Sequence, residues 1–233
     1  MTDGILVVNK PAGWTSHDVV NKARNLLGGC KVGHTGTLDP FATGVLVLLI
    51  GKATRQAKLF EHDVKGYDAE ITFGSATDTY DCTGTVTETG DPGAVDTAAI
   101  AREIESLRGV SLQTPPPYSA VKVGGVRLYK LARKGKPAEA QPREITIHEV
   151  NGSIAAFPVV RLQMVCSKGT YVRAVAHELG RKIGCPAHLS ALERTRVGDF
   201  TLADACDFLT AAKASDATML AQNIRECREP ETR

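Results

Sequence analysis

The feature that most constrains this chain is a continuous apolar run, residues 45–50, with a glycine on each side. A run of this length is typical of a strand that is buried on both faces. A glycine-punctuated loop, residues 33–44, leads directly into it and carries Asp39 immediately before Pro40. Because proline pushes the preceding residue toward extended backbone, Asp39 is expected on a stiffened segment at the end of a buried strand. A buried carboxylate there needs a cation from elsewhere in the chain, although an Asp-Pro pair alone also marks an ordinary turn.

The chain has 233 residues, 42% of them hydrophobic, and a net charge of +2. This length predicts one or two domains with a substantial core. The total charge gives no sign of a nucleic-acid partner, but its distribution does. Acidic side chains dominate residues 78–105, and basic ones dominate residues 122–143, close to Tyr118 and Tyr129. Such a basic segment is typical of a surface that binds a phosphate backbone, and a solvated helix face explains the pattern equally well.

Cysteine and histidine spacing argues against a metal site. The six cysteines include no Cys-x-x-Cys pair, and the six histidines include no His-x-x-x-His pair, so we predict no zinc. The sequence Gly51-Lys52-Ala53 lacks the spacing of a nucleotide-binding P-loop. No secretory signal opens the chain, and no apolar run is long enough to span a bilayer. We therefore expect a cytoplasmic protein with reduced cysteines and neither metal nor cofactor.

Periodicity and chain breakers predict the remaining elements. Strands are expected at residues 4–8, 67–73, 145–150 and 159–166, and helices at 16–27, 52–61, 96–108 and from 170 onward. Ser16 and Thr170 are the expected N-caps of the first and last of these helices. Arg173 would then lie in a first helical turn, where a cation opposes the helix dipole. A residue that breaks a local rule often marks a functional site.

The segment Gly-His-Thr-Gly-Thr-Leu-Asp-Pro-Phe-Ala-Thr-Gly-Val-Leu, residues 33–46, resembles the catalytic signature of the TruB family of tRNA pseudouridine synthases. Segments similar to other motifs of the family occur in the family's order, at residues 4–18 before this signature and at residues 65–84, 113–125, 166–174 and 187–198 after it. The resemblance covers roughly residues 4–210. It implies an α+β pseudouridine synthase fold, with a large mixed, mainly antiparallel sheet, flanking helices and a central active-site cleft.

The resemblance implies a catalytic group of three residues. Asp39 falls on the family's catalytic aspartate. Arg173, in Ser-Lys-Gly-Thr-Tyr-Val-Arg, falls on the arginine that pairs with this aspartate, and such a pairing keeps a carboxylate ionised. Tyr67 falls on the strand tyrosine that stacks on the flipped base, although the alternating pattern alone favours a tyrosine of the core.

Other residues match positions that bind or support. The substrate-binding positions are those of His34, where the target base leaves its stack, and of Tyr171 and Leu192, which contact and wall the flipped uracil. Lys10 and Pro11 match a motif that supports the catalytic strand. Glu193 departs from the family, which usually has arginine there, so one cation near the RNA is replaced by an acid.

The implied function is isomerisation of uridine 55 in the T loop of tRNA, by base flipping and without cofactor or metal. We expect a catalytic domain at residues 1–210 and an RNA-gripping insertion at about 113–143, ordered by the T stem-loop. A short helical extension, residues 211–233, is expected to follow without a PUA domain, and the protein is expected to be a monomer. Two alternatives remain open: a pseudouridine synthase for another RNA, and a non-catalytic tRNA-binding or tRNA-folding protein.

Overall fold

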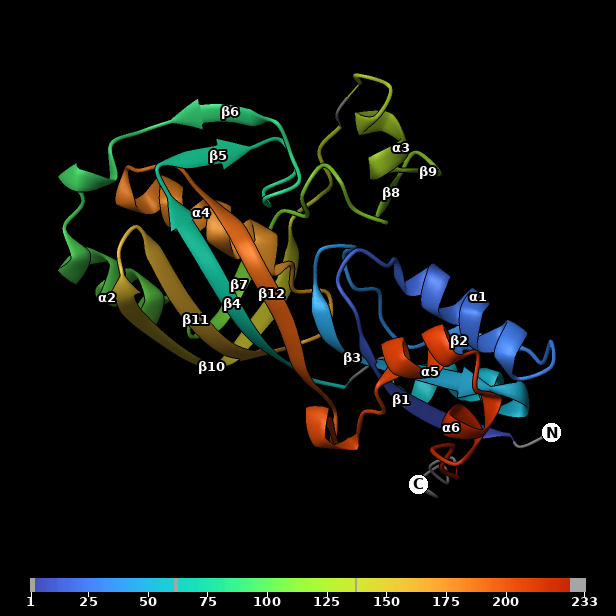
Figure 1. The fold of residues 1–233 in the computed structure, drawn as a ribbon. Coiled ribbons are helices and arrows are strands. Elements are labelled where there is room, and N and C mark those ends of the chain that lie inside the picture. The colour runs from blue at the N-terminus through green and yellow to red at the C-terminus, as the bar shows by residue number, and fades with distance from the viewer. Residues whose placement is uncertain (1–2, 61–62, 137, 227–233) are drawn as a thin grey trace. The chain divides into compact units, whose positions relative to one another are not determined.

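The computed structural model describes residues 3–60, 63–136 and 138–226, and they form two compact units (Figure 1). Unit 1 comprises residues 1–67 and 193–233, and unit 2 comprises residues 68–192. The chain passes from one unit to the other within two strands, β4 (Lys65–Phe73) and β12 (Ala187–Val197). No helix in these described ranges is long and apolar enough to cross a membrane.

Unit 1 is built around the strand that the apolar run predicts. Strand β3 (Thr43–Ile50) pairs antiparallel with β1 (Gly4–Lys10) on one side, and antiparallel with β2 (Val32–His34) on the other. The end of β12 joins β3 in parallel, with Glu193 opposite Thr43 and Arg194 opposite Gly44. The short strand β13 (Phe200–Thr201) pairs with β12.

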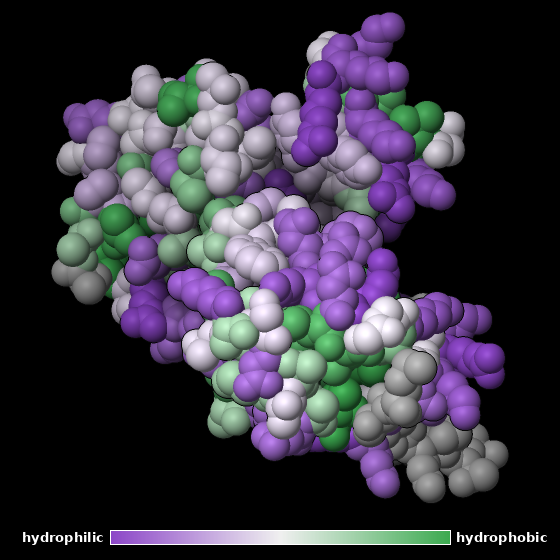
Figure 2. Space-filling view, turned by 45° about the vertical axis from the view of Figure 1, so that its right-hand side comes forward, coloured by the Kyte–Doolittle hydropathy of each residue, from purple (hydrophilic) through white to green (hydrophobic). Residues whose placement is uncertain are grey.

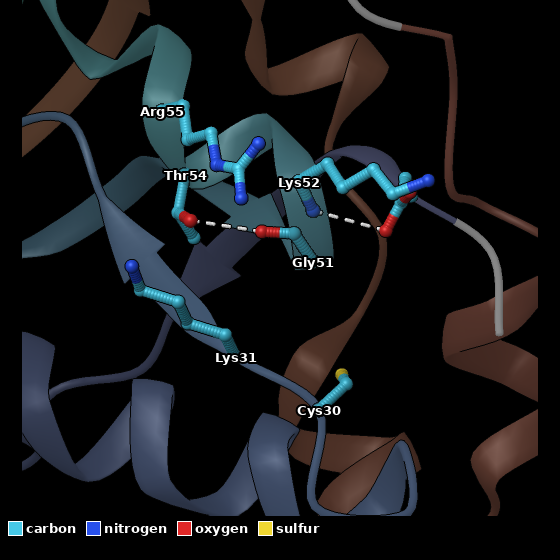
Figure 3. A pocket seen from close by; sticks show the side chains of 7 residues that line it. Cys30, Lys31, Gly51, Lys52, Thr54 and Arg55 are labelled. Carbon is cyan, nitrogen blue, oxygen red and sulfur yellow. Dashed lines mark hydrogen bonds and ion pairs between the residues drawn. The ribbon is translucent and has the colours of Figure 1, made fainter.

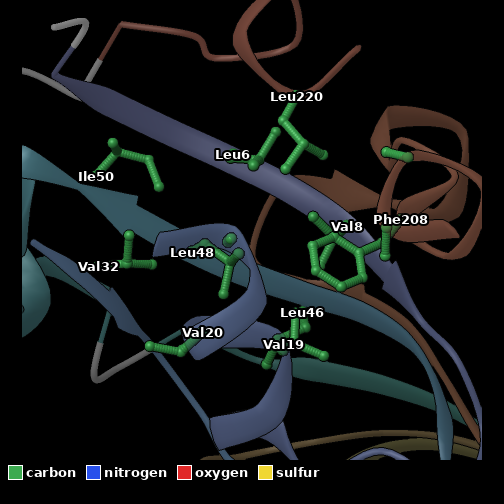
Figure 4. Close-up of a cluster of buried hydrophobic side chains, with 13 residues drawn as sticks. Leu6, Val8, Val19, Val20, Val32, Leu46, Leu48, Ile50, Phe208 and Leu220 are labelled. Atoms are coloured by element: carbon green, nitrogen blue, oxygen red, sulfur yellow. The ribbon is translucent and has the colours of Figure 1, made fainter. Parts of the chain in front are cut away.

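Both faces of β3 are covered, which confirms the predicted double burial. One face carries Leu46, Leu48 and Ile50, packed with side chains of α1 (Ser16–Leu26), α5 (Phe208–Ala214) and α6 (Ala217–Ala221) (Figure 4). The other face carries Val45, Val47 and Leu49, packed against Phe60 at the end of the 3₁₀ helix η1 (Gly51–Phe60). A second 3₁₀ turn, η3 (Leu202–Asp204), precedes α5.

Unit 2 is a sheet with helices on it. Its strands follow the order β12, β4, β11 (Val159–Cys166), β10 (Arg143–Ala156) and β7 (Gly109–Gln113). Helices α2 (Thr97–Ser106) and α4 (Val172–Ile183) lie against one another, and α2 lies against β10. The hairpin β5 (Ser75–Thr77) and β6 (Val86–Thr89) leads through η2 (Pro92–Ala94) into α2. The fold is thus α+β with a large mixed, mainly antiparallel sheet, as predicted.

The predicted insertion forms a small subdomain within unit 2. It contains the hairpin β8 (Lys122–Val123) and β9 (Val126–Arg127), followed by α3 (Leu128–Ala132). Val121, Leu128 and Ala140 form its apolar core, and Tyr171 packs against this core. Seven basic side chains of the insertion are exposed: Lys122, Arg127, Lys130, Arg133, Lys134, Lys136 and Arg143. The segment around α3 is accordingly mostly hydrophilic on the surface (Figure 2).

Both predicted N-caps were wrong by one residue. Thr15, not Ser16, caps α1, and it forms a capping box with Asp18. Helix α4 begins after Tyr171, without a cap from its own segment. The Gln113 side chain instead fixes the backbone of Tyr171, since it accepts from the Tyr171 amide at 2.8 Å and donates to the Tyr171 carbonyl at 3.1 Å. The predicted helix at 52–61 is the 3₁₀ helix η1.

The part of the predicted C-terminal extension that is described belongs to the core of unit 1. Leu220 of α6 is fully buried there, and the Arg225 backbone pairs with Ile5 of β1. Residues 227–233, including Cys227, lie outside the described residues. The other five cysteines (Cys30, Cys82, Cys166, Cys185 and Cys206) form no disulfide with one another.

Candidate active site

The Asp39 loop is held through its backbone by the side chains of Ser16, Lys10 and Arg194. The Ser16 hydroxyl at the start of α1 accepts from the Leu38 amide at 2.9 Å and donates to the Leu38 carbonyl at 3.3 Å. The carbonyl of Pro40 accepts from Lys10 Nζ at 3.2 Å and from the Gly13 amide at 2.8 Å. A turn from the Asp39 carbonyl to the amide of residue 42 closes the loop at 3.1 Å. The half-buried carboxylate of Asp39 therefore projects from backbone that is fixed on both sides.

Lys10 is a completely buried cation beside this loop. Its ammonium group donates to three carbonyls, of Trp14 at 2.6 Å, Pro11 at 2.9 Å and Pro40 at 3.2 Å. Burial lowers the pKa of Lys10 to about 8, and the negative charge of Asp39 acts in the opposite direction. Three acceptors match the three donors of a charged ammonium group, so Lys10 is a cation at neutral pH.

Arg194 is a second buried cation, and sequence reasoning did not single it out. Its side chain in β12 is 2% exposed. The guanidinium donates from Nε to the Val45 carbonyl at 2.8 Å, from Nη1 to the Thr37 carbonyl at 3.3 Å and from Nη2 to the Gly36 carbonyl at 3.1 Å. Burial lowers the pKa of Arg194, whereas a hydrogen bond with Tyr67 and the charges of Tyr67 and Asp39 raise it.

Two further predicted residues lie in unit 1. Tyr67 is half-buried in β4, and the hydrogen bond with Arg194 ties it to the same cation that holds the Asp39 loop. His34 ends β2, and its Nδ1 is buried without a hydrogen-bond partner among the described residues. Burial, with Arg194 and His17, lowers the pKa of His34, so its imidazole is neutral at neutral pH. Unit 1 thus brings Asp39, Lys10 and Tyr67 together around Arg194.

Arg173, in the first turn of α4, belongs to unit 2 and is anchored there by a turn of the chain. Its guanidinium donates to the Thr79 carbonyl at 2.9 Å and to the Tyr118 carbonyl at 3.0 Å, and Nη1 lies 3.6 Å from Asp81 Oδ2. The other oxygen of Asp81 accepts from the Thr79 hydroxyl at 2.8 Å and from the Thr83 amide at 2.9 Å. The carboxylate of Asp81 compensates the charge of Arg173, which explains why this buried cation is tolerated in the first turn of a helix. The pairing of Arg173 with Asp39 that the motif implies stays a prediction.

Tyr171 and Leu192 also belong to unit 2. The Tyr171 backbone is fixed by both amide atoms of Gln113, and its side chain packs on the core of the insertion. Leu192 lies near the end of β12 and is 8% exposed. Their roles toward a base stay predictions.

A basic pocket lies at the other end of β3 from the Asp39 loop. Its volume is about 320 Å³, and Lys31, Lys52 and Arg55 contribute cations to its lining (Figure 3). Asp3 offsets part of this charge, since its carboxylate accepts from the Lys52 amide at 3.0 Å and lies 3.7 Å from Lys52 Nζ. The remaining positive charge suits an anion such as a phosphate group.

Comparison with known proteins identifies two family domains in this chain, which together cover residues 24–229. Residues 24–172 match the N-terminal domain of the TruB family of pseudouridylate synthases, and residues 173–229 match the C-terminal domain of tRNA pseudouridylate synthase B. The chain belongs to the TruB family. This confirms the family that the motifs predicted, a family of isomerases.

Individual TruB relatives agree. The chain is 47% identical over 203 residues to tRNA pseudouridine synthase B of Syntrophotalea carbinolica, covering 87% of this chain and 66% of the relative, slightly less than two thirds. It is 49% identical over 219 residues to tRNA pseudouridine synthase B of Symbiobacterium thermophilum, covering 91% of this chain and 73% of the relative. These matches extend over both units.

Solved structures share the fold of this chain. A chain in the crystal structure of a Cbf5–Nop10–Gar1 complex matches with a TM-score of 0.73 and 26% identity, over 96% of this chain and 60% of that chain. A chain in the structure of an H/ACA RNP bound to a substrate RNA containing 2′-deoxyuridine matches with a TM-score of 0.67 and 25% identity, over 90% of this chain and 52% of that chain.

Two buried cations, Lys10 and Arg194, determine the electrostatics around the candidate catalytic carboxylate. The Asp39 carboxylate projects from rigid backbone, and the charges of Lys10 and Arg194 both favour its ionised form. Arg194, Ser16, Asp81 and Gln113 were missed as site residues from the sequence. Each of the four acts through a partner at least 22 residues away in the chain, apart from the local contacts of Asp81.

Proposed function

We propose that this chain is a tRNA pseudouridine synthase that isomerises uridine 55 of the T loop. The observation that carries the proposal is the Asp39 carboxylate, in a TruB signature, on a loop held by Ser16, Lys10 and Arg194. A reaction at a sugar carbon needs such a carboxylate in one fixed position, because misplacement by about 1 Å can cost about 10²-fold in rate.

The chemistry breaks the N1–C1′ bond of uridine, turns the uracil and forms a C5–C1′ bond; C5 then loses its proton to solvent, and N1 gains one. The target base must first leave its stack. Asp39 then either attacks C1′, as a retaining glycosidase carboxylate does, or removes the C2′ proton to give a glycal. Either route requires an ionised carboxylate, which Lys10 and Arg194 favour. No electron transfer or phosphoryl transfer takes place, so the reaction needs neither metal nor cofactor.

The remaining predicted residues are proposed to bind the flipped nucleotide. The Tyr67 ring would hold the uracil through its rotation by stacking, worth about 1–3 kcal/mol in nucleic-acid complexes. Tyr171 and Leu192 would line the base pocket, and His34 would contact the RNA at the vacated position. Arg173 would act with Asp39 as the motif implies, in a monomeric enzyme.

The proposed partner is the T stem-loop of tRNA. The seven exposed cations of the insertion and the three of the basic pocket offer contacts to phosphates. Binding by such contacts weakens steeply as salt rises, because each neutralised phosphate releases counterions. The identity of 47–49% to tRNA pseudouridine synthases B favours tRNA over another RNA.

Tritium release from a tRNA transcript labelled with [5-³H]uridine tests the proposal. We expect release by the wild-type protein in the presence of EDTA, no release by Asp39→Asn, and no release from a transcript with cytidine at position 55. Equal release by both proteins would contradict the role of Asp39. Tight tRNA binding without any release would instead favour the non-catalytic alternative.

A further inference from the structure

Arg194 contacts the candidate site through all three nitrogens of its guanidinium. Three N–H groups of one guanidinium bind three backbone carbonyls, of Gly36 and Thr37 before Asp39 and of Val45 after it. The same guanidinium hydrogen-bonds Tyr67. One buried side chain therefore connects both ends of the Asp39 loop with the tyrosine proposed to stack on the base.

We propose that Arg194 is a positioning residue, which fixes the Asp39 loop and the Tyr67 ring relative to one another for the reaction. The inference rests on the proposed function, because it supposes that the carboxylate and the ring act on the same nucleotide. Arg194 itself contacts backbone and Tyr67, so its effect on the reacting atoms passes through these groups.

The choice of arginine supports a positioning role. A planar guanidinium offers five donors in a rigid fork, whereas an ammonium group is a compact point charge on a flexible stem. A buried cation is costly, and apolar residues of similar size often stabilise a fold as well or better. A 2%-exposed arginine with its donors turned toward the Asp39 loop is therefore poorly explained by stability alone.

The backbone of β12 lies unusually close to the start of β3, at Gly44. An added Cβ at Gly44 would lie 2.2 Å from the Arg194 carbonyl oxygen. Only a glycine at the start of β3 lets β12 come near enough for the guanidinium to reach Gly36, Thr37 and Val45. The close packing of β3 and β12 thus places the Arg194 side chain within reach of the Asp39 loop.

Arg194→Lys and Arg194→Met test the proposal, with Arg196→Met as a matched control from the same strand. The measurements are the single-turnover rate at saturating enzyme, the Kd for tRNA, the melting temperature, and amide hydrogen exchange of a peptide covering residues 36–45. For both Arg194 variants we expect a rate about 10²-fold lower, a Kd within about threefold and faster exchange in the peptide. Arg196→Met should leave all four unchanged.

Tyr67→Phe adds a second, milder test, since it removes the hydroxyl that binds Arg194 and keeps the ring. We expect its rate loss not to multiply with that of Arg194→Lys in the double variant, because both changes break one connection. Full multiplication would overturn the proposed link between the two residues.

Further results of these experiments also test the proposed role of Arg194. A folded Arg194→Lys protein with wild-type rate and exchange would overturn the proposal, and so would a loss confined to Kd. If neither Arg194 variant folds, Arg194 is a stability residue and the proposal is wrong. If the wild-type protein shows no activity on tRNA while peptide 36–45 still exchanges faster in the variants, the proposed function fails and the structural part of the inference stands.

Discussion

Ser16 and Leu38, 22 residues apart, exchange two hydrogen bonds: the Ser16 hydroxyl accepts from the Leu38 amide and donates to the Leu38 carbonyl. Both residues are buried. The residue that follows is Asp39, so the first residue of α1 sets the backbone direction from which the carboxylate projects. The adjacent hydroxyl, that of Thr15, caps the same helix and hydrogen-bonds Asp18 within it.

This pair of neighbouring hydroxyls gives the first prediction. Ser16→Ala leaves the buried Leu38 amide without its acceptor, which should cost about 1–3 kcal/mol of unfolding free energy and lower the single-turnover rate at least tenfold. Thr15→Ala removes an N-cap, which should cost about 1 kcal/mol and leave the rate unchanged. Urea unfolding and single-turnover assays measure both. Equal rates for the two variants would show that the Leu38 contact does not position Asp39.

The elements defined by local pattern could be predicted from the sequence. The apolar run at 45–50 predicted β3 with both faces covered, and helices α1, α2 and α4 lie within a few residues of their predicted places. The N-cap of α1 was misplaced, because Ser16 and the neighbouring Thr15 both carry a hydroxyl that can cap a helix. Only the tertiary fold shows that the Ser16 hydroxyl is hydrogen-bonded to the backbone of Leu38 instead.

The same limit applies to the site. Asp39 was found through its motif, but Arg194 lies in a segment with Arg196, where alternating arginines resemble a solvated strand. Its burial depends on the carbonyl of Val45, 149 residues away in the chain. Likewise, Gln113 caps α4 from 58 residues away. Contacts of this range follow from the tertiary fold and leave no periodic signal in the sequence.

Gly44 gives the second prediction. Its φ is +102°, and an added Cβ would lie 2.2 Å from the Arg194 carbonyl oxygen. Gly44→Ala should therefore destabilise unit 1 by about 3 kcal/mol or more, from left-handed strain and from the clash together. Gly33→Ala is the control, because its Cβ would first meet Thr54 Cγ2 at 3.8 Å, an ordinary contact. Thermal unfolding compares the two, and equal melting temperatures would contradict the close approach of β12.

Asp81 gives the third prediction. Asp81→Asn keeps an acceptor for Thr79 and Thr83 but turns an amide toward Arg173, so the buried arginine loses its anion. Leaving a buried charge less well paired should cost about 1–3 kcal/mol, and we expect a lower rate with tRNA binding retained. Asp78→Asn is the control from the same turn, since Asp78 binds Tyr118 and the amide of residue 85 instead. If both variants behave alike, Asp81 acts on the turn and not through Arg173.

Lys10 gives the last prediction: rising pH should increase the stability of the protein and decrease its activity. The folded pKa of about 8 lies below the ordinary 10.5 of the unfolded chain. Between these values the unfolded state binds more protons, so the Lys10 contribution to the free energy of unfolding rises with pH. Relative to Lys10→Met, the wild-type protein should gain about 2 kcal/mol between pH 7 and pH 9.5.

Activity should change in the opposite direction over the same range. A neutral amine has two N–H groups for the three carbonyls that Lys10 now binds, so the contact with Pro40 is weakened and the Asp39 loop loosens. The wild-type rate should fall above pH 8 relative to Lys10→Arg, which stays charged and shares any titration of the substrate. Urea unfolding and single-turnover rates at pH 7 and 9.5 measure the two effects. A protein that lost stability and rate together with rising pH would show that Lys10 is not the titrating group.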